Sequence, residues 1–73
     1  MTSYEYYKAL SKKADDACYV GDFDKYDLLA EQATSFRNQN FTKQDWERLI
    51  EETNNIQAKI GFTKAMNKLF PEI

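Results

Sequence analysis

The chain has 73 residues, of which 42% are hydrophobic, two are Gly and one is Pro. This length and composition predict one folded domain with a small hydrophobic core. The net charge of -2, from 10 basic and 12 acidic residues, argues against a protein that coats nucleic acid, because such a protein needs many Lys and Arg side chains against the phosphates.

The residue types also exclude several kinds of chemistry. The chain has no His and a single cysteine, Cys18, so it has neither the usual zinc ligand sets nor a Ser-His or Cys-His pair. It has no Gly-rich phosphate loop. We therefore expect no catalytic activity, no cofactor and no metal. No basic stretch followed by an apolar run marks a signal peptide, and no apolar run reaches membrane-spanning length, so we expect a cytoplasmic location.

The first half of the chain predicts two helices, over residues 3-19 and 23-37. Thr2 and Glu5 have the spacing of a capping box at the start of the first helix. Gly21 suits the left-handed position after a helix, and Asp22 suits the next N-cap. So short a connection predicts an antiparallel helical hairpin.

Each of these helices has one apolar face, and small residues occupy much of it. Small side chains allow two helices to approach closely. The predicted inner residues of the first helix are Tyr4, Tyr7, Leu10, Ala14, Ala17 and Cys18. The predicted inner residues of the second helix are Phe23, Tyr26, Leu29, Ala30, Ala33 and Phe36.

The stretch from Gly21 to Ala33 resembles the turn and second helix of a tetratricopeptide repeat. Gly21, Phe23 and Ala33 stand at consensus positions, whereas Ala17 and Tyr26 depart from the pattern. The match covers about a third of the chain, and the sequence has no second copy, which stacked repeats need to bury their faces. The resemblance implies a helical hairpin.

The cleanest helical pattern in the chain runs over residues 43-60. Thr42 and Asp45 have capping-box spacing, and Phe41 and Trp46 have the spacing of a hydrophobic staple. We expect one long amphipathic helix here. Its predicted apolar face consists of Trp46, Leu49, Ile50, Thr53, Ile56 and Ile60.

The residues after Gly61 are again helical in spacing, but their apolar side lies opposite to that of Trp46. Two explanations fit: the helix breaks at Gly61 and a short fourth helix over 63-70 folds back, or one long helix continues and favours a dimer. Gly inside a helix costs about 1 kcal/mol relative to Ala, which favours the break. Pro71 ends the last helix.

Together these patterns predict an all-α fold, a small bundle of three to four helices. In it, an antiparallel hairpin packs on a long third helix, within a single helical domain spanning 1-73. A core this small is marginally stable on its own, so a partner protein, including a second copy in a homodimer, would add stability.

Two features predict a protein-binding surface. Acidic residues gather near the tip of the hairpin, where a basic partner could dock, although capping and solubility also explain them. Several large side chains fall outside the apolar faces, and Tyr is favoured in interfaces. The candidate partner-binding residues are Tyr6, Tyr19, Asp22, Asp24, Asp27 and Leu28.

A second interpretation concerns nucleic acid. The segment from Ile56 to Phe70 resembles the turn of a helix-turn-helix motif, with Gly61 in the turn and Thr63 as the cap of the next helix. Gln57 departs from the motif, where a small residue is usual. The residues that would contact nucleic acid are Lys59, Lys64, Asn67 and Lys68.

From these observations we expect a small non-catalytic cytosolic protein that binds another protein through a helical surface, as an accessory regulator, inhibitor or chaperone-like subunit. The alternative is a transcriptional regulator that binds nucleic acid through the helix-turn-helix-like segment around Gly61-Phe70. A second alternative is a structural homo-oligomer.

Overall fold

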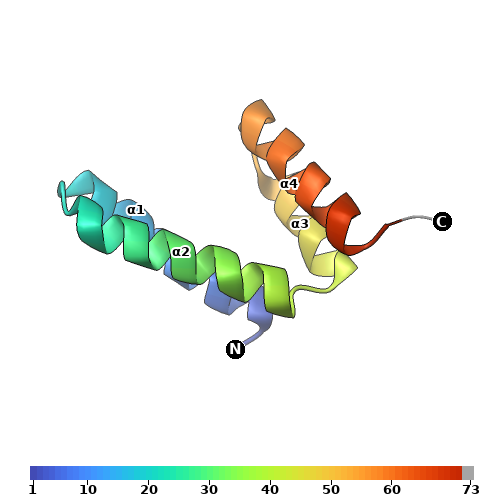
Figure 1. The fold of residues 1–73 in the computed structure, drawn as a ribbon, viewed down its shortest axis with the longest axis horizontal. Helices are drawn as coiled ribbons and strands as arrows, with labels where there is room; N and C mark the ends of the chain where they lie inside the picture. Colours follow the sequence, from blue (N-terminus) through green and yellow to red (C-terminus); the bar gives the residue numbers. More distant parts are fainter. Residues whose placement is uncertain (72–73) are drawn as a thin grey trace. The chain divides into compact units, whose positions relative to one another are not determined.

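The computed structural model describes residues 1-71, and within them the chain forms four α-helices and no β-strand (Figure 1). The prediction of an all-α fold is confirmed. The four helices are α1 (Ser3–Tyr19), α2 (Phe23–Asn40), α3 (Lys43–Glu52) and α4 (Ile56–Leu69).

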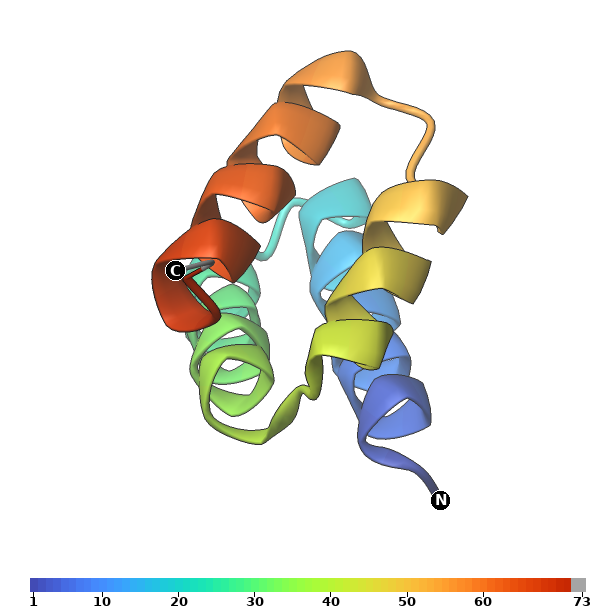
Figure 2. The same ribbon diagram turned by 90° about the vertical axis from the view of Figure 1, so that its right-hand side faces the viewer.

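The helices belong to two compact units. The first unit, Met1–Asn40, contains α1 and α2, and the second unit begins at Phe41 and contains α3 and α4. In each unit the two helices lie side by side and run in opposite directions, as Figures 1 and 2 both show. The prediction that the whole chain is a single domain stays a prediction.

Local hydrogen bonds fix both ends of the first helix and the turn that follows it. The Thr2 hydroxyl accepts a hydrogen bond from the Glu5 amide at 3.1 Å, and the Glu5 carboxylate accepts one from the Thr2 amide at 3.2 Å. After α1, Gly21 adopts a φ of 81°, which a residue with a side chain rarely takes. The Asp22 carboxylate then caps α2 by accepting from the Lys25 amide at 3.2 Å. The predicted caps and hairpin turn are confirmed.

The core of the first unit is narrow, because small residues let the two helices approach closely. Its buried side chains are Tyr4, Tyr7, Ala14, Ala17 and Ala33. Two residues that we predicted to face inward, Cys18 and Phe23, are instead exposed. Both lie beside the turn at the tip of the hairpin, where neither helix of this unit extends far enough to cover them.

The second unit is built around Trp46, whose side chain has 0% relative exposure. The Phe41 ring meets the Trp46 ring edge-on, with centroids 5.7 Å apart, which confirms the staple spacing seen in the sequence. From α4, the Phe62 ring lies 6.4 Å from the same indole. The capping box of Thr42 and Asp45 is also confirmed, with bonds of 3.1 and 3.2 Å.

The helix break lies elsewhere than we predicted. The helices expected over 43-60 and 63-70 are wrong: α3 has ten residues, the chain breaks at Thr53–Asn55, and α4 runs through Gly61. Thr53 leaves the helical conformation, with φ -81° and ψ 126°, and its hydroxyl donates to the Leu49 carbonyl at 2.6 Å. The Asn55 side chain caps α4 by accepting from the Ala58 amide at 3.1 Å.

Helix propensity and packing together explain this break. Thr and Asn both favour caps over helix interiors, so three of them in a row cost a continuous helix more than one Gly does. The break lets the chain reverse and brings Phe62 against Trp46. The apolar residues after Gly61, which lie opposite to Trp46 when one continuous helix is assumed, therefore form the inner face of a separate antiparallel helix, α4. Ile56 and Ile60, which we had placed on the inner face, are exposed.

We expect Gly61→Ala to raise the free energy of unfolding by about 0.5–1 kcal/mol, because Ala is the better residue inside a helix. A Cβ atom at Gly61 would meet no other atom within 4 Å. Gly21→Ala is the matched control and should lower stability by about 1–2 kcal/mol, since its φ of 81° is left-handed. Urea denaturation followed by circular dichroism measures both. A destabilising Gly61→Ala would place Gly61 outside a helix.

Candidate functional site

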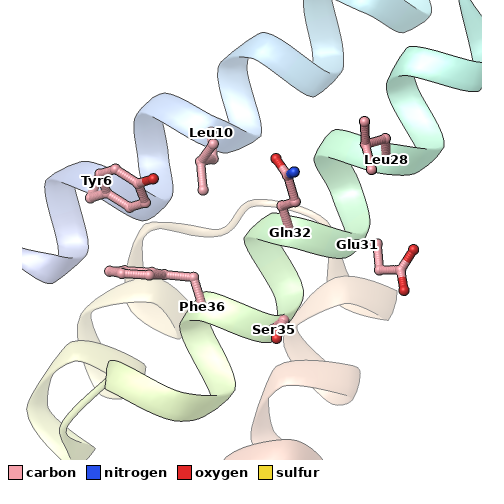
Figure 3. A pocket seen from close by; sticks show the side chains of 7 residues that line it. All are labelled: Tyr6, Leu10, Leu28, Glu31, Gln32, Ser35 and Phe36. Carbon is pink, nitrogen blue, oxygen red and sulfur yellow. The ribbon is translucent and has the colours of Figure 1, made fainter.

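A groove runs between α1 and α2 in the first unit, with a volume of about 570 Å³ (Figure 3). At one end, the Tyr6 ring of α1 and the Phe36 ring of α2 face each other, with centroids 4.5 Å apart and planes tilted by 48°. The residues that line this part are Tyr6, Leu10, Leu28, Glu31, Gln32, Ser35 and Phe36.

Helical spacing places these side chains in rows along the groove. Tyr6 and Leu10 are one turn apart on α1, and Leu28, Gln32 and Phe36 follow one another at four-residue steps on α2. Side chains at this spacing share one face of a helix. The two helices therefore present parallel walls to the groove, which Figure 3 shows from close by.

A second hollow of about 530 Å³ continues the groove toward the tip of the hairpin. On each helix, residues three or four positions apart connect the two hollows, so they lie on one face of the hairpin. We call the two together the hairpin groove. The residues that line its tip half are Lys13, Asp16, Ala17, Val20, Asp22, Lys25 and Leu29.

The half of the groove next to Tyr6 and Phe36 has fewer charged lining residues than the tip half. Tyr6 is 45% exposed and Leu28 is 56% exposed, so both present apolar surface to solvent. Among its described lining residues, only Glu31 is charged, while Gln32 and Ser35 offer hydrogen-bonding groups. Such a surface can bind apolar side chains and orient them with a few polar contacts.

The structure brings two of the predicted partner-binding residues together and separates the others. Tyr6 and Leu28 line the same half of the groove. Asp22 caps α2 and lines the tip half. Asp24 lies in the first turn of α2, where a negative charge is favourable, and Asp27 is exposed on α2.

Tyr19, at the last position of α1, is almost wholly exposed and lines neither half of the groove. The role in partner binding that we assigned to these residues stays a prediction.

Sequence reasoning missed several lining residues because it treated them as core. Leu10 and Phe36 were predicted to face inward, yet they are half-buried and line the groove. The four-residue steps from Tyr6 to Leu10 and from Leu28 to Gln32 would have revealed these rows. What the sequence lacked was the relative rotation of the two helices.

The residues predicted to bind nucleic acid all belong to one unbroken helix. The proposed turn at Gly61 is wrong, because Gly61 lies inside α4. Lys64 and Lys68 are exposed one turn apart, whereas Lys59 is half-buried and lies half a turn of the helix from Lys68, at about 100° per residue. Asn67 is exposed on α4. Lys64, Asn67 and Lys68 therefore share one side of α4, and Lys59 does not join them. Binding of nucleic acid by these residues stays a prediction.

The chain is thus a small all-α protein whose helical hairpin has a solvent-exposed groove between its two helices. Comparison with protein-family models, with curated proteins and with solved structures finds no match for this chain. In the described part of the chain, no three acidic or Cys side chains lie together as metal ligands would. Within residues 1-71, no helix is both long enough and apolar enough to cross a membrane.

Proposed function

We propose that this chain is a small non-catalytic cytoplasmic protein that binds another protein in the hairpin groove, as an accessory regulator, inhibitor or chaperone-like subunit. The observation that carries the proposal is the pair of exposed apolar side chains, Tyr6 and Leu28, in one groove. Exposed apolar surface that gathers in a groove, rather than being scattered, is typical of an interaction site.

The shape of the groove favours a helical segment of the partner. Two helices packed side by side leave a groove that a third helix can fill with side chains at i, i+3, i+4 and i+7. The 17 residues of α1 span about 25 Å at 1.5 Å per residue, which is the length of a helix of four to five turns. A bound helix would cover the rings of Tyr6 and Phe36 and the side chain of Leu28.

A substitution at Leu28 tests this proposal. Leu28→Asp puts a charge on the apolar wall, and we expect it to weaken partner binding at least about tenfold, because a buried unpaired charge is costly. The matched control is Phe23→Asp, which changes another exposed apolar residue of α2 that lines neither half of the groove.

The measurement is quantitative capture from lysate of the source organism, with wild type and both variants compared at equal loading. Circular dichroism checks that each variant folds. We expect wild type and Phe23→Asp to retain the same partner proteins and Leu28→Asp to lose them. Equal retention by all three chains would contradict it.

A further inference from the structure

We infer that, when no other protein is bound, helix α4 of a second copy of this chain occupies the hairpin groove. This inference rests on the proposed function, because it names an occupant for the same groove. The first observation is an uncovered apolar row on α4. Ile56 is 71% exposed and Ile60 is 46% exposed, and they lie one helical turn apart.

Helix α2 carries a negative edge beside the apolar wall of the groove. Glu31 is the charged residue among the lining residues of the half next to Tyr6. Asp27 and Asp24 precede it on α2 at steps of four and three residues, so the three carboxylates follow one flank of the helix, next to Leu28. All three side chains are exposed.

Helix α4 carries the complementary arrangement. It has three Lys residues and neither Asp nor Glu between Ile56 and Leu69. Lys64 and Lys68 are exposed one turn apart, on the flank next to Ile60. An apolar row with a basic edge therefore faces an apolar wall with an acidic edge, and this complementarity orients the two surfaces and speeds their association.

One chain carries both surfaces of this contact, the groove and α4. A dimer with a two-fold axis would place α4 of each copy in the groove of the other and so fill both grooves. The resulting dimer would bury Leu28 and Tyr6 of each copy, along with Ile56 and Ile60. A partner protein with a basic amphipathic helix would then compete with α4 for the groove.

Charge reversal tests this arrangement by sedimentation velocity at low salt, from about 10 to about 500 micromolar chain. Wild type is expected to dimerise in this range. Glu31→Lys and Lys64→Glu should each weaken dimerisation about tenfold or more, because a repulsive pair replaces an attractive one in both contacts of the dimer. Glu47→Lys, which reverses an exposed acid on α3, is the matched control and should dimerise like wild type.

Mixing the two variants gives the decisive result. In a mixed dimer, Lys at position 31 of one chain meets Glu at position 64 of the other, and the second contact is native. The mixture should therefore dimerise like wild type, although neither variant does so alone. A wild-type chain that stays monomeric throughout, or a mixture that stays as weak as its components, would overturn the inference.

The two proposals fail in different ways. If the chain is monomeric while Leu28→Asp still loses captured proteins, the second copy is not the occupant and the groove remains a binding site. If Leu28→Asp retains every protein that wild type retains, and dimerises as wild type does, the groove itself is not the binding surface.

Discussion

Trp46→Ala is expected to lower the free energy of unfolding by about 3–5 kcal/mol, the largest effect of any single substitution in the second unit. Trp46 is completely buried, and the centroids of the Phe41 and Phe62 rings lie 5.7 and 6.4 Å from that of its own ring. Its removal leaves a cavity between α3 and α4 that two aromatic rings cannot fill. At the usual stability per residue, a chain of this length has a total stability of about 4–11 kcal/mol, so the loss takes a large share of it.

The measurement is guanidinium denaturation followed by circular dichroism, since the variant lacks the Trp whose fluorescence would otherwise report unfolding of this unit. Ile56→Ala is the control, because it shortens an apolar side chain of the same unit that is 71% exposed. We expect the control to change stability by no more than about 0.5 kcal/mol. If Trp46→Ala costs as little as Ile56→Ala, Trp46 does not hold α3 and α4 together.

Tyr7→Ala is expected to have the corresponding effect in the first unit, a loss of about 3–4 kcal/mol. The Tyr7 side chain is buried between α1 and α2, and its hydroxyl accepts a hydrogen bond from the Arg37 guanidinium at 3.4 Å. The same guanidinium lies 5.7 Å from the centre of the Tyr7 ring. The substitution removes both the ring and this contact from a core that otherwise consists largely of Ala.

Two further variants separate the causes. Tyr7→Phe removes only the hydroxyl and should cost about 0.5–1.5 kcal/mol. Tyr19→Ala removes an exposed ring from the same helix and should change stability by less than about 0.5 kcal/mol. Thermal and urea denaturation measure all three. If Tyr7→Ala and Tyr19→Ala prove equal, the ring of Tyr7 does not hold the hairpin.

The sequence was informative wherever the signal was local. The capping boxes of Thr2 and Thr42, the left-handed Gly21 and the pairing of Phe41 with Trp46 all depend on residues at most five positions apart. Such features follow from side-chain chemistry and spacing alone. For this reason both ends of α1 and the start of α3 were predicted to the residue.

The position of the helix break depended on a balance between two local signals. Gly61 was weighed as a breaker by itself, whereas Thr53 was placed on the apolar face of a helix that was expected to continue to residue 60. In the folded chain Asn55 is an N-cap and Gly61 is helical. Contact between Phe62 and Trp46 favours the break at Thr53–Asn55, and this contact cannot be predicted from local sequence spacing.

Only part of the groove could be predicted from the sequence, because its lining depends on how α1 is rotated relative to α2. Tyr6 and Leu28 were recognised because each falls off the apolar face of its own helix. That they line one groove follows from how the small residues Ala17 and Ala33 set the helices against each other. The acidic cluster at the tip, by contrast, divides into a cap at Asp22 and an edge along α2.

Site-specific photo-crosslinking shows directly whether this protein binds its partner in the hairpin groove. A photoreactive phenylalanine analogue is placed at Leu28 or, as control, at Phe23, and the chain is irradiated in cells of the source organism. We expect covalent adducts from position 28, with a second copy or with another protein, and few or none from position 23. Adducts that form at Phe23 and not at Leu28 would contradict it.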